Sequence, residues 1–464
     1  MDQGDAVNSN NGSCLPNDNA AILIKQPKTK RDVVAFFLLG LCNNFCYGIM
    51  LSAAFDILSE FDKKYTTTIS PVLTTASLYT NITTSEPLNY KDCNKVSTGA
   101  VLLADIFPSL FAKTTLPLYF EYVSYNLMIS ISISLGAASL LIVSYSNTLA
   151  LSLIGVGCAS AGTGIGEFLF LSLSSYFDKS VIVGYSTGTG VSGVLYALAY
   201  VLLTSVLGLS PRQSMLIVLV VPAVSFIVYY LLLSHRPSNK KHQKPKDELS
   251  ESLINNIINS SQTSLQESVN VIDDITQSED KVNGSLASKK GPHRLTAKEK
   301  IKLVKPLTKY MVPLGVVYLA EYLINQGIVE LIYFPTLTWM NHDDQYRWYQ
   351  LVYQVGVFVS RSSIAVFTIK HLWVLPILQC AAFVFLLTVA MYHYIPSIWI
   401  IFVTIAFEGL LGGFAFANTF YKILIEVEEC YQEFAMGLTS IASSLGITIS
   451  GLVSIPLHNA LCKS

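Results

Sequence analysis

The sequence has too little charge for a protein that folds in water. Only 13% of its 464 residues are Asp, Glu, Lys or Arg, whereas a soluble domain carries about 25%. Hydrophobic residues make up 52% of the chain, so its main solvent is expected to be lipid. The net charge of −1 offers no basic surface, and no nucleic-acid partner is predicted.

The sequence also lacks the patterns that metal sites and enzymes use. Its eight cysteines show no CxxC pair or other metal-like spacing. Its seven histidines are scattered over polar segments and ends of apolar stretches. No HExxH helix or nucleophile–His–acid cluster appears. The sequence therefore predicts no metal, no cofactor and no enzymatic activity.

What the sequence does contain is a series of long apolar stretches. A helix needs about 20 apolar residues to cross a bilayer, and eleven stretches reach this length. They cover residues 33–55, 98–120, 126–146, 149–176, 183–207, 214–234, 307–334, 349–369, 372–392, 397–420 and 435–457. The second, which holds Asp105 and Lys113, and the eighth, which holds Arg361, are the most polar. The sequence predicts an all-α polytopic membrane protein.

Three polar segments lie outside the predicted spans. Residues 1–32 are expected to be a disordered tail, and residues 235–306 a disordered linker, because neither can bury enough apolar surface to fold. Residues 56–97 form a predicted loop that contains the glycosylation acceptor Asn81-Ile82-Thr83. There is no cleavable signal peptide, so the first span is expected to stay as an anchor.

The charges beside the spans predict the topology. Lys and Arg residues flank the first span and both ends of the linker, and the positive-inside rule places such flanks in the cytosol. Six spans separate the tail from the linker, so both lie on the cytosolic side and Asn81 on the lumenal side. The predicted domains are an N-terminal six-helix bundle, 33–234, and a C-terminal five-helix bundle, 307–464, with a lumenal C-terminus.

The two bundles show traces of a repeat. Lys113 in the second span corresponds to Arg361 in the eighth, and Glu167 in the fourth corresponds to Glu408 in the tenth. Two related bundles with a binding site between them are typical of major-facilitator transporters. The alternative is coincidence among glycine-rich helices.

Ionisable residues within the spans are candidates for a polar path. Each costs at least about 2.5–3.5 kcal/mol at bilayer depth. Glu321 and Asn325 share one helix face with Tyr318 by their spacing. Because desolvation disfavours a charged carboxyl, Glu321 is a candidate proton carrier, and a hydrogen-bond clamp between helices is the alternative.

Arg361 stays charged at any accessible pH, so the sequence predicts a carboxylate partner or a ligand anion for it. Either the partner is Glu321, Glu408 or Glu167 in a structural ion pair, or the guanidinium binds solute. Lys113 can reach the cytosolic interface, whereas Asp105 is too deep. The candidate pathway residues are Glu321, Asn325, Gln326, Arg361, Glu408, Glu167, Lys113, Asp105, Asn43 and Asn44.

Two short motifs have less direct interpretations. Gly188-Thr-Gly190-Val-Ser-Gly193 matches a dinucleotide fingerprint, but it lies inside a span with no preceding strand, so it predicts close helix packing. Acidic residues ahead of Leu253-Ile254 in the linker resemble an endolysosomal sorting signal, for which adaptors would be the partners.

Several long and unusual blocks of the sequence run in order from about residue 33 to the last span. They are Leu38-Leu-Gly-Leu-Cys-Asn-Asn-Phe45, Met50-Leu-Ser-Ala-Ala54, Val101-Leu-Leu-Ala-Asp105, Ser186-Thr-Gly-Thr-Gly190, Val317-Tyr-Leu-Ala-Glu-Tyr-Leu-Ile-Asn-Gln-Gly327, Gln345-Tyr-Arg-Trp-Tyr-Gln350, Ser360-Arg-Ser-Ser363, Glu408-Gly-Leu-Leu-Gly-Gly413 and Glu433-Phe-Ala-Met436. Together these blocks resemble the battenin family, the lysosomal membrane proteins of juvenile Batten disease.

The resemblance implies a glycosylated lysosomal or vacuolar protein with a major-facilitator-like fold. It also implies links to lysosomal pH, basic amino acids and glycerophosphodiesters. We expect efflux of a small polar solute by alternating access, coupled to protons. The alternative is a membrane scaffold without transport activity that regulates trafficking and acidification through the linker.

Overall fold

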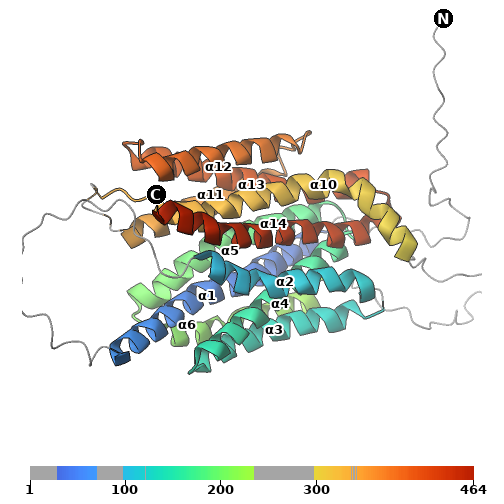
Figure 1. Cartoon of the computed structure of the whole chain (residues 1–464). Coiled ribbons are helices and arrows are strands. Elements are labelled where there is room, and N and C mark those ends of the chain that lie inside the picture. The colour runs from blue at the N-terminus through green and yellow to red at the C-terminus, as the bar shows by residue number, and fades with distance from the viewer. Residues whose placement is uncertain are drawn as a thin grey trace, which may run out of the picture. The chain divides into compact units, whose positions relative to one another are not determined.

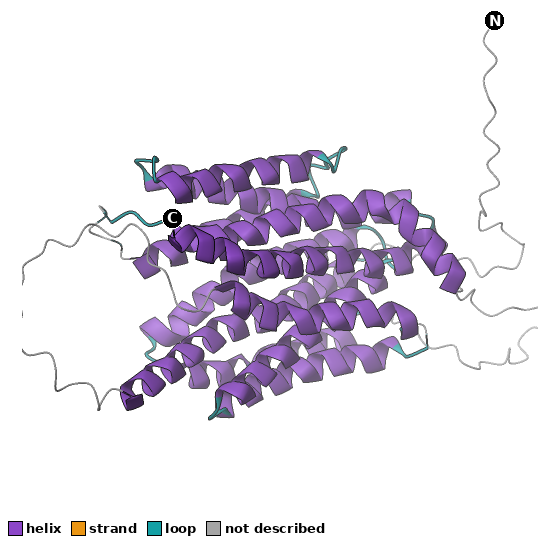
Figure 2. Cartoon of the chain, in the orientation of Figure 1, coloured by secondary structure: helices purple, strands orange, loops and turns teal. Residues whose placement is uncertain are grey.

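The structure, a computed structural model, describes residues 29–69, 98–120, 122–234, 297–335, 337, 340 and 342–463. The membrane helices belong to one compact unit, Ile24–Arg236 with Lys298–Ser464. Helices and loops account for everything described, and no strand occurs within these ranges (Figure 2). The all-α prediction is therefore confirmed.

The N-terminal bundle contains six membrane-crossing segments. They are α1 (Lys30–Ile69), α2 (Thr98–Tyr119), α3 (Tyr125–Tyr145), α4 (Leu149–Ser174), α5 (Ser180–Val201) with the π-turn η2 (Leu202–Val206), and α6 (Pro211–Val218) followed by α7 (Val220–Ile227) and η3 (Val228–Leu232). Side-chain caps begin several of these helices. Ser124 and Thr148 accept backbone N–H bonds at the starts of α3 and α4, and Ser210 with Gln213 forms a capping box on α6.

The C-terminal bundle contains five segments. They are α10 (Ala297–Leu323) with η4 (Ile324–Ile328) and η5 (Val329–Leu331), α11 (His342–Ser363), α12 (Val374–Tyr392), α13 (Ile398–Glu426) and α14 (Glu429–Lys463). The first turns of α10 and the C-terminal end of α14 lie at opposite ends of the bundle (Figure 1). The chain therefore enters and leaves this bundle at opposite ends.

Eleven segments match the eleven predicted spans. Within the described ranges, nine of them are long and apolar enough to cross a membrane on those grounds alone. The other two are α2, which contains Asp105, Lys113 and two prolines, and α11, which begins with a polar stretch. They are the two spans that the sequence marked as most polar. Both helices pack at the interface of the two bundles, so their charged residues can lie inside the protein.

Three predicted segment boundaries are wrong. The tail was predicted to extend to residue 32, but α1 begins at Lys30. The loop 56–97 was predicted to begin at residue 56, but α1 continues to Ile69. The linker was predicted to end at residue 306, but α10 begins at Ala297. In each case polar residues extend the helix beyond the apolar stretch, so hydropathy alone makes the helix too short.

The contacts between helices support the predicted repeat. Within the bundles, α2 packs on α4 and α11 packs on α13. Between the bundles, α2 packs on α14 and α5 packs on α11. If the two halves are related, α2 corresponds to α11 and α5 corresponds to α14. The contact of α2 with α14 then corresponds to the contact of α11 with α5, as expected for two related halves.

The glycine motifs lie where helices approach most closely, as predicted. A Cβ atom at Gly188 would overlap the Phe37 carbonyl of α1, and one at Gly193 would overlap the Gln354 side chain of α11. Gly409 lies in the same way against the Tyr353 carbonyl. These glycines allow backbones to approach to distances that larger residues would prevent.

Candidate functional site

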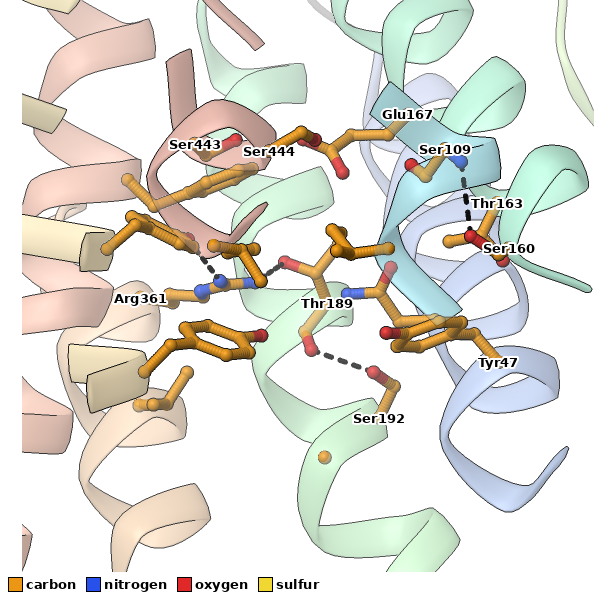
Figure 3. Close-up of a pocket in the computed structure, with 18 of the residues that line it drawn as sticks. Tyr47, Ser109, Ser160, Thr163, Glu167, Thr189, Ser192, Arg361, Ser443 and Ser444 are labelled. Atoms are coloured by element: carbon orange, nitrogen blue, oxygen red, sulfur yellow. Dashed lines mark hydrogen bonds between the residues drawn. The ribbon is translucent and has the colours of Figure 1, made fainter. Parts of the chain in front are cut away.

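A polar cavity of about 160 Å³ lies between the two bundles (Figure 3). Its walls come from α1, α2, α4 and α5 on one side and from α10, α11, α13 and α14 on the other. Six tyrosines line it, namely Tyr47, Tyr185, Tyr196, Tyr318, Tyr322 and Tyr353, together with a group of serine and threonine hydroxyls. Hydroxyl groups can both donate and accept, so the cavity suits a small polar solute.

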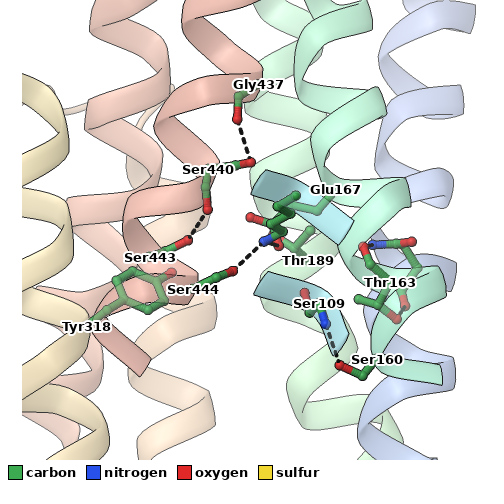
Figure 4. A network of polar contacts seen from close by, with 12 residues as sticks. Ser109, Ser160, Thr163, Glu167, Thr189, Tyr318, Gly437, Ser440, Ser443 and Ser444 are labelled. Atoms are coloured by element: carbon green, nitrogen blue, oxygen red, sulfur yellow. Dashed lines mark hydrogen bonds and ion pairs between the residues drawn. The ribbon is translucent and has the colours of Figure 1, made fainter. Parts of the chain in front are cut away.

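Lys113 forms an ion pair in the wall of this cavity. Its Nζ lies 2.9 Å from Glu167 Oε2 and donates to Ser444 Oγ at 2.9 Å. Glu167 belongs to α4 and Ser444 to α14, so the ammonium joins the two bundles (Figure 4). The Lys113 side chain is 3% exposed and that of Glu167 is 18% exposed. Lys113 is therefore neutralised inside the protein and does not extend to the interface.

Within the described part of the chain, Arg361 has no carboxylate partner, unlike in the ion pair that was one of its two predicted environments. Among the described residues, no acid lies within ion-pair distance of it. Its Nη1 donates to Thr189 Oγ1 at 2.7 Å and its Nη2 to Tyr318 Oη at 3.1 Å (Figure 3). The buried Nε has no partner.

Two weaker effects compensate the Arg361 charge. Its Cζ lies 4.3 Å from the centroid of the Phe416 ring, close enough for a cation–π interaction. Arg361 also lies in the last turn of α11, where the carbonyl ends of the helix favour a cation. The guanidinium thus keeps its charge beside the cavity, and its buried Nε–H has no acceptor.

Glu321, Asn325 and Glu408 do not line this cavity, contrary to our expectation. They form a separate buried cluster within the C-terminal bundle. Tyr353 donates its hydroxyl to Glu321 Oε1, and Asn325 Nδ2 donates to Glu408 Oε1 at 2.6 Å. The π-turn η4 carries Asn325 and Gln326; Gln326 is half-buried and also lies outside the cavity lining.

The remaining predicted pathway residues lie in the N-terminal bundle. Asp105 is 1% exposed and accepts a hydrogen bond from the cavity tyrosine Tyr47. Asn43 donates to the Thr163 carbonyl at 3.2 Å, which makes it a clamp between α1 and α4. Asn44, one residue on, lines the cavity. The sequence alone did not distinguish a contact between helices from a position in the cavity for either asparagine. In the structure Asn43 makes a contact between helices, and Asn44 lines the cavity.

The sequence did not reveal the hydroxyl and aromatic lining of the cavity. Thr189 and Ser444 contact the two cations directly, yet threonine and serine are common in membrane helices and carry no special pattern. The 25 tyrosines of the chain were the available signal, because many of them lie within apolar stretches. Asn81, Leu253 and Ile254 lie outside the described residues.

A second set of contacts joins the bundles at the end where α10 and α14 begin. Glu433 of α14 accepts hydrogen bonds from Tyr125 of α3 and from Tyr176 in the turn after α4, the latter at 2.6 Å. Lys300 of α10 donates to the Pro117 carbonyl of α2 at 2.9 Å.

Comparison with known proteins identifies the family. The model of the CLN3 protein family matches residues 34–464. The chain belongs to the CLN3 family. Battenin of the dog, Canis lupus familiaris, is 41% identical over 436 residues, which cover 93% of this chain and 91% of battenin. Protein btn-1 of Neurospora crassa is 33% identical over 93% of this chain and 88% of its own length.

The fold comparison agrees with the two-bundle architecture. A crystal structure of the human organic anion transporter MFSD10 (TETRAN) superposes with a TM-score of 0.52 at 12% sequence identity and covers 94% of this chain and 96% of that chain. This CLN3-family chain therefore has a major-facilitator-like fold. By family it is a multi-pass protein of the lysosomal or vacuolar membrane.

Proposed function

We propose that this CLN3-family protein exports glycerophosphodiesters from the lysosomal or vacuolar lumen by alternating access. The proposal depends above all on the lack of a carboxylate partner for Arg361 in the cavity wall. The acids and bases that line the cavity are Lys113, Glu167 and Arg361. Lys113 and Glu167 neutralise each other, so the formal charge of the lining is that of Arg361. A phosphodiester carries one negative charge and matches it.

The chemistry of the guanidinium favours such an anion. Arginine presents five N–H donors in a planar fork that fits two phosphate oxygens. Thr189 and Tyr318 accept two of these N–H bonds, and Nε–H is left without a partner. The hydroxyl groups of the surrounding tyrosines and serines can bind the glycerol moiety.

A basic amino acid is the other solute class implied by the family. It would need an accessible carboxylate. Glu167 is the acid among the lining residues, and Lys113 already occupies it. Glu321 and Glu408 lie outside the cavity lining. The charge of the cavity therefore favours the anionic solute.

Uptake by purified protein in liposomes tests the assignment. We expect Arg361→Ala to abolish transport of a glycerophosphodiester and Arg361→Lys to restore only part of it, because lysine binds as a point charge. Arg347→Ala is the matched control, since the Arg347 side chain is 72% exposed. The proposal is wrong if Arg361→Ala abolishes arginine transport and leaves phosphodiester transport unchanged.

The topology of the proposed exporter follows from its charged flanks. We propose that the N-terminus and the 235–306 region face the cytosol, that Asn81 is glycosylated in the lumen, and that adaptors bind Leu253 and Ile254. The rival scaffold function requires that region for activity. If the protein is an exporter, deleting residues 240–290 should leave its transport activity in liposomes intact. If the deletion variant is delivered correctly but loses its activity, the scaffold function is favoured.

A further inference from the structure

Two carboxyl groups lie buried together behind the cavity. Glu321 of α10 is 2% exposed and Glu408 of α13 is 0% exposed. Asn325 links the two residues, because its Nδ2 donates to the backbone carbonyl of Glu321 at 3.0 Å and to the carboxyl oxygen Oε1 of Glu408 at 2.6 Å. Gln350 of α11 donates to Asn325 Oδ1 at 3.4 Å. Three helices thus contribute to one polar cluster.

No base forms an ion pair with either carboxyl within the described ranges of the chain. Arg361 of α11 acts on Glu321 only through space. α12, which packs on α13, contains no acidic or basic residue. α14 packs on η4 and contributes His458. The other titratable groups of α10 and α11 near the pair are the hydroxyls of Tyr318, Tyr322 and Tyr353.

Each carboxyl group also has one oxygen without a hydrogen bond. Tyr353 donates to Glu321 Oε1, and Asn325 donates to Glu408 Oε1. The Oε2 atoms of both residues are buried and have no partner. A carboxylate that is buried without a cation and with an unsatisfied oxygen is strongly disfavoured. Two such carboxylates in one cluster disfavour each other further.

We infer that Glu321 and Glu408 form a proton-binding site, in which at least one proton is held on an Oε2 atom. Binding joins a proton from water to a carboxylate oxygen and makes a neutral acid; release returns the proton to water, and no other bond changes. This removes a charge that the cluster has no cation to neutralise. The protein therefore contains an acid site separate from the solute cavity.

Tyr353 connects this acid site with the cavity. Its hydroxyl bonds to Glu321, and the same residue lines the cavity. A shift of α11 that carries Arg361 must also move Tyr353. Solute binding and proton binding can therefore influence each other through one helix. This coupling rests on the proposed transport function, whereas the proton-binding site itself does not.

Infrared difference spectroscopy of the purified protein tests the site without any transport assay. We expect a carbonyl band of a protonated carboxylic acid at neutral pH, with the downshift in heavy water that such a group shows. Glu321→Gln and Glu408→Gln should each diminish or abolish this band. Glu426→Gln is the control, because Glu426 is 38% exposed and paired with Lys309 and Lys422.

Either of two results would overturn the inference. One is a wild-type spectrum without a protonated-acid band, which decides the matter even if a variant fails to fold. The other is a band that persists unchanged in both glutamine variants. Size-exclusion profiles establish that the variants are folded.

Transport measurements then test the coupling separately. Glu408→Gln should retain exchange of the solute at equal pH on both sides and lose the stimulation by a pH gradient. If the infrared band behaves as expected but gradient stimulation persists in Glu408→Gln, the coupling is refuted. Absence of any solute transport in the wild type would refute the proposed function and leave the infrared result valid.

Discussion

Breaking the Lys113–Glu167 ion pair should cost far more stability than removing both partners. The two groups lie 2.9 Å apart, with side chains 3% and 18% exposed. Removing one partner of a buried pair costs roughly 3–5 kcal/mol, because an uncompensated charge stays buried. The residual exposure of Glu167 places Lys113→Met near the lower limit, at about 3 kcal/mol.

The reverse substitution should be at least as harmful. Glu167→Leu leaves the Lys113 ammonium with Ser444 as its remaining partner, so we expect a loss of about 4 kcal/mol. The double variant replaces both charges with apolar groups of similar volume, and such replacements are often neutral or stabilising. We therefore expect it to be within about 1 kcal/mol of the wild type.

A double-mutant cycle measured by unfolding in detergent micelles checks these values. The expected interaction between the two sites is about 7 kcal/mol, the sum of the two single losses, because the double variant loses almost nothing. The exposed pair Arg347–Asp344, at 3.6 Å with side chains 72% and 41% exposed, is the control; its cycle should give about 0–1 kcal/mol. Additive losses at Lys113 and Glu167, with the double variant the least stable, would refute the buried-pair interpretation.

Three further outcomes are expected. Gly412→Ala should displace the Glu321 carboxyl, because a Cβ atom there would overlap it, and should destabilise the protein by about 1–3 kcal/mol in the same unfolding assay. Glu433→Ala removes the acceptor of two tyrosine hydroxyls that join the bundles. In this variant, Ser443→Cys in the cavity should react faster than in the wild-type background with an impermeant thiol reagent applied from the side on which α10 begins. Asn81→Gln should increase electrophoretic mobility as enzymatic deglycosylation does, and unchanged mobility would contradict the lumenal position of this loop.

The fold could be predicted because the bilayer imposes simple length and charge rules. Apolar stretches of about 20 residues identify the spans, and the two most polar stretches were still correctly identified as membrane segments. Hydropathy failed at helix ends, as at Ile69 and Ala297, where the helix continues as polar sequence. The helical backbone hydrogen bonds continue there through residues that hydropathy does not recognise.

The candidate site could be predicted only in part. Periodicity predicted that Tyr318, Glu321 and Asn325 share one helix face, but it gave no information on what each residue contacts. The structure directs Tyr318 to Arg361 and Asn325 to Glu408. One face of a helix can contact two neighbouring helices, so its residues can contribute to two sites. A single sequence does not show how each helix is rotated about its axis relative to its neighbours.

The difference between the two halves is the central feature of the proposed mechanism. Lys113 and Glu167 in α2 and α4 correspond to Arg361 and Glu408 in α11 and α13. The N-terminal pair is closed at 2.9 Å, whereas in the C-terminal bundle Arg361 bonds to Thr189 and Tyr318 and Glu408 bonds to Asn325. A closed pair in both halves would leave the cavity uncharged and the acid ionised. In the C-terminal half Arg361 and Glu408 are separated. Arg361 is then a cation that can bind the solute, and Glu408 is a carboxyl group that can bind the proton. On this proposal, one half maintains the structure of the site and the other half carries the exchangeable charges.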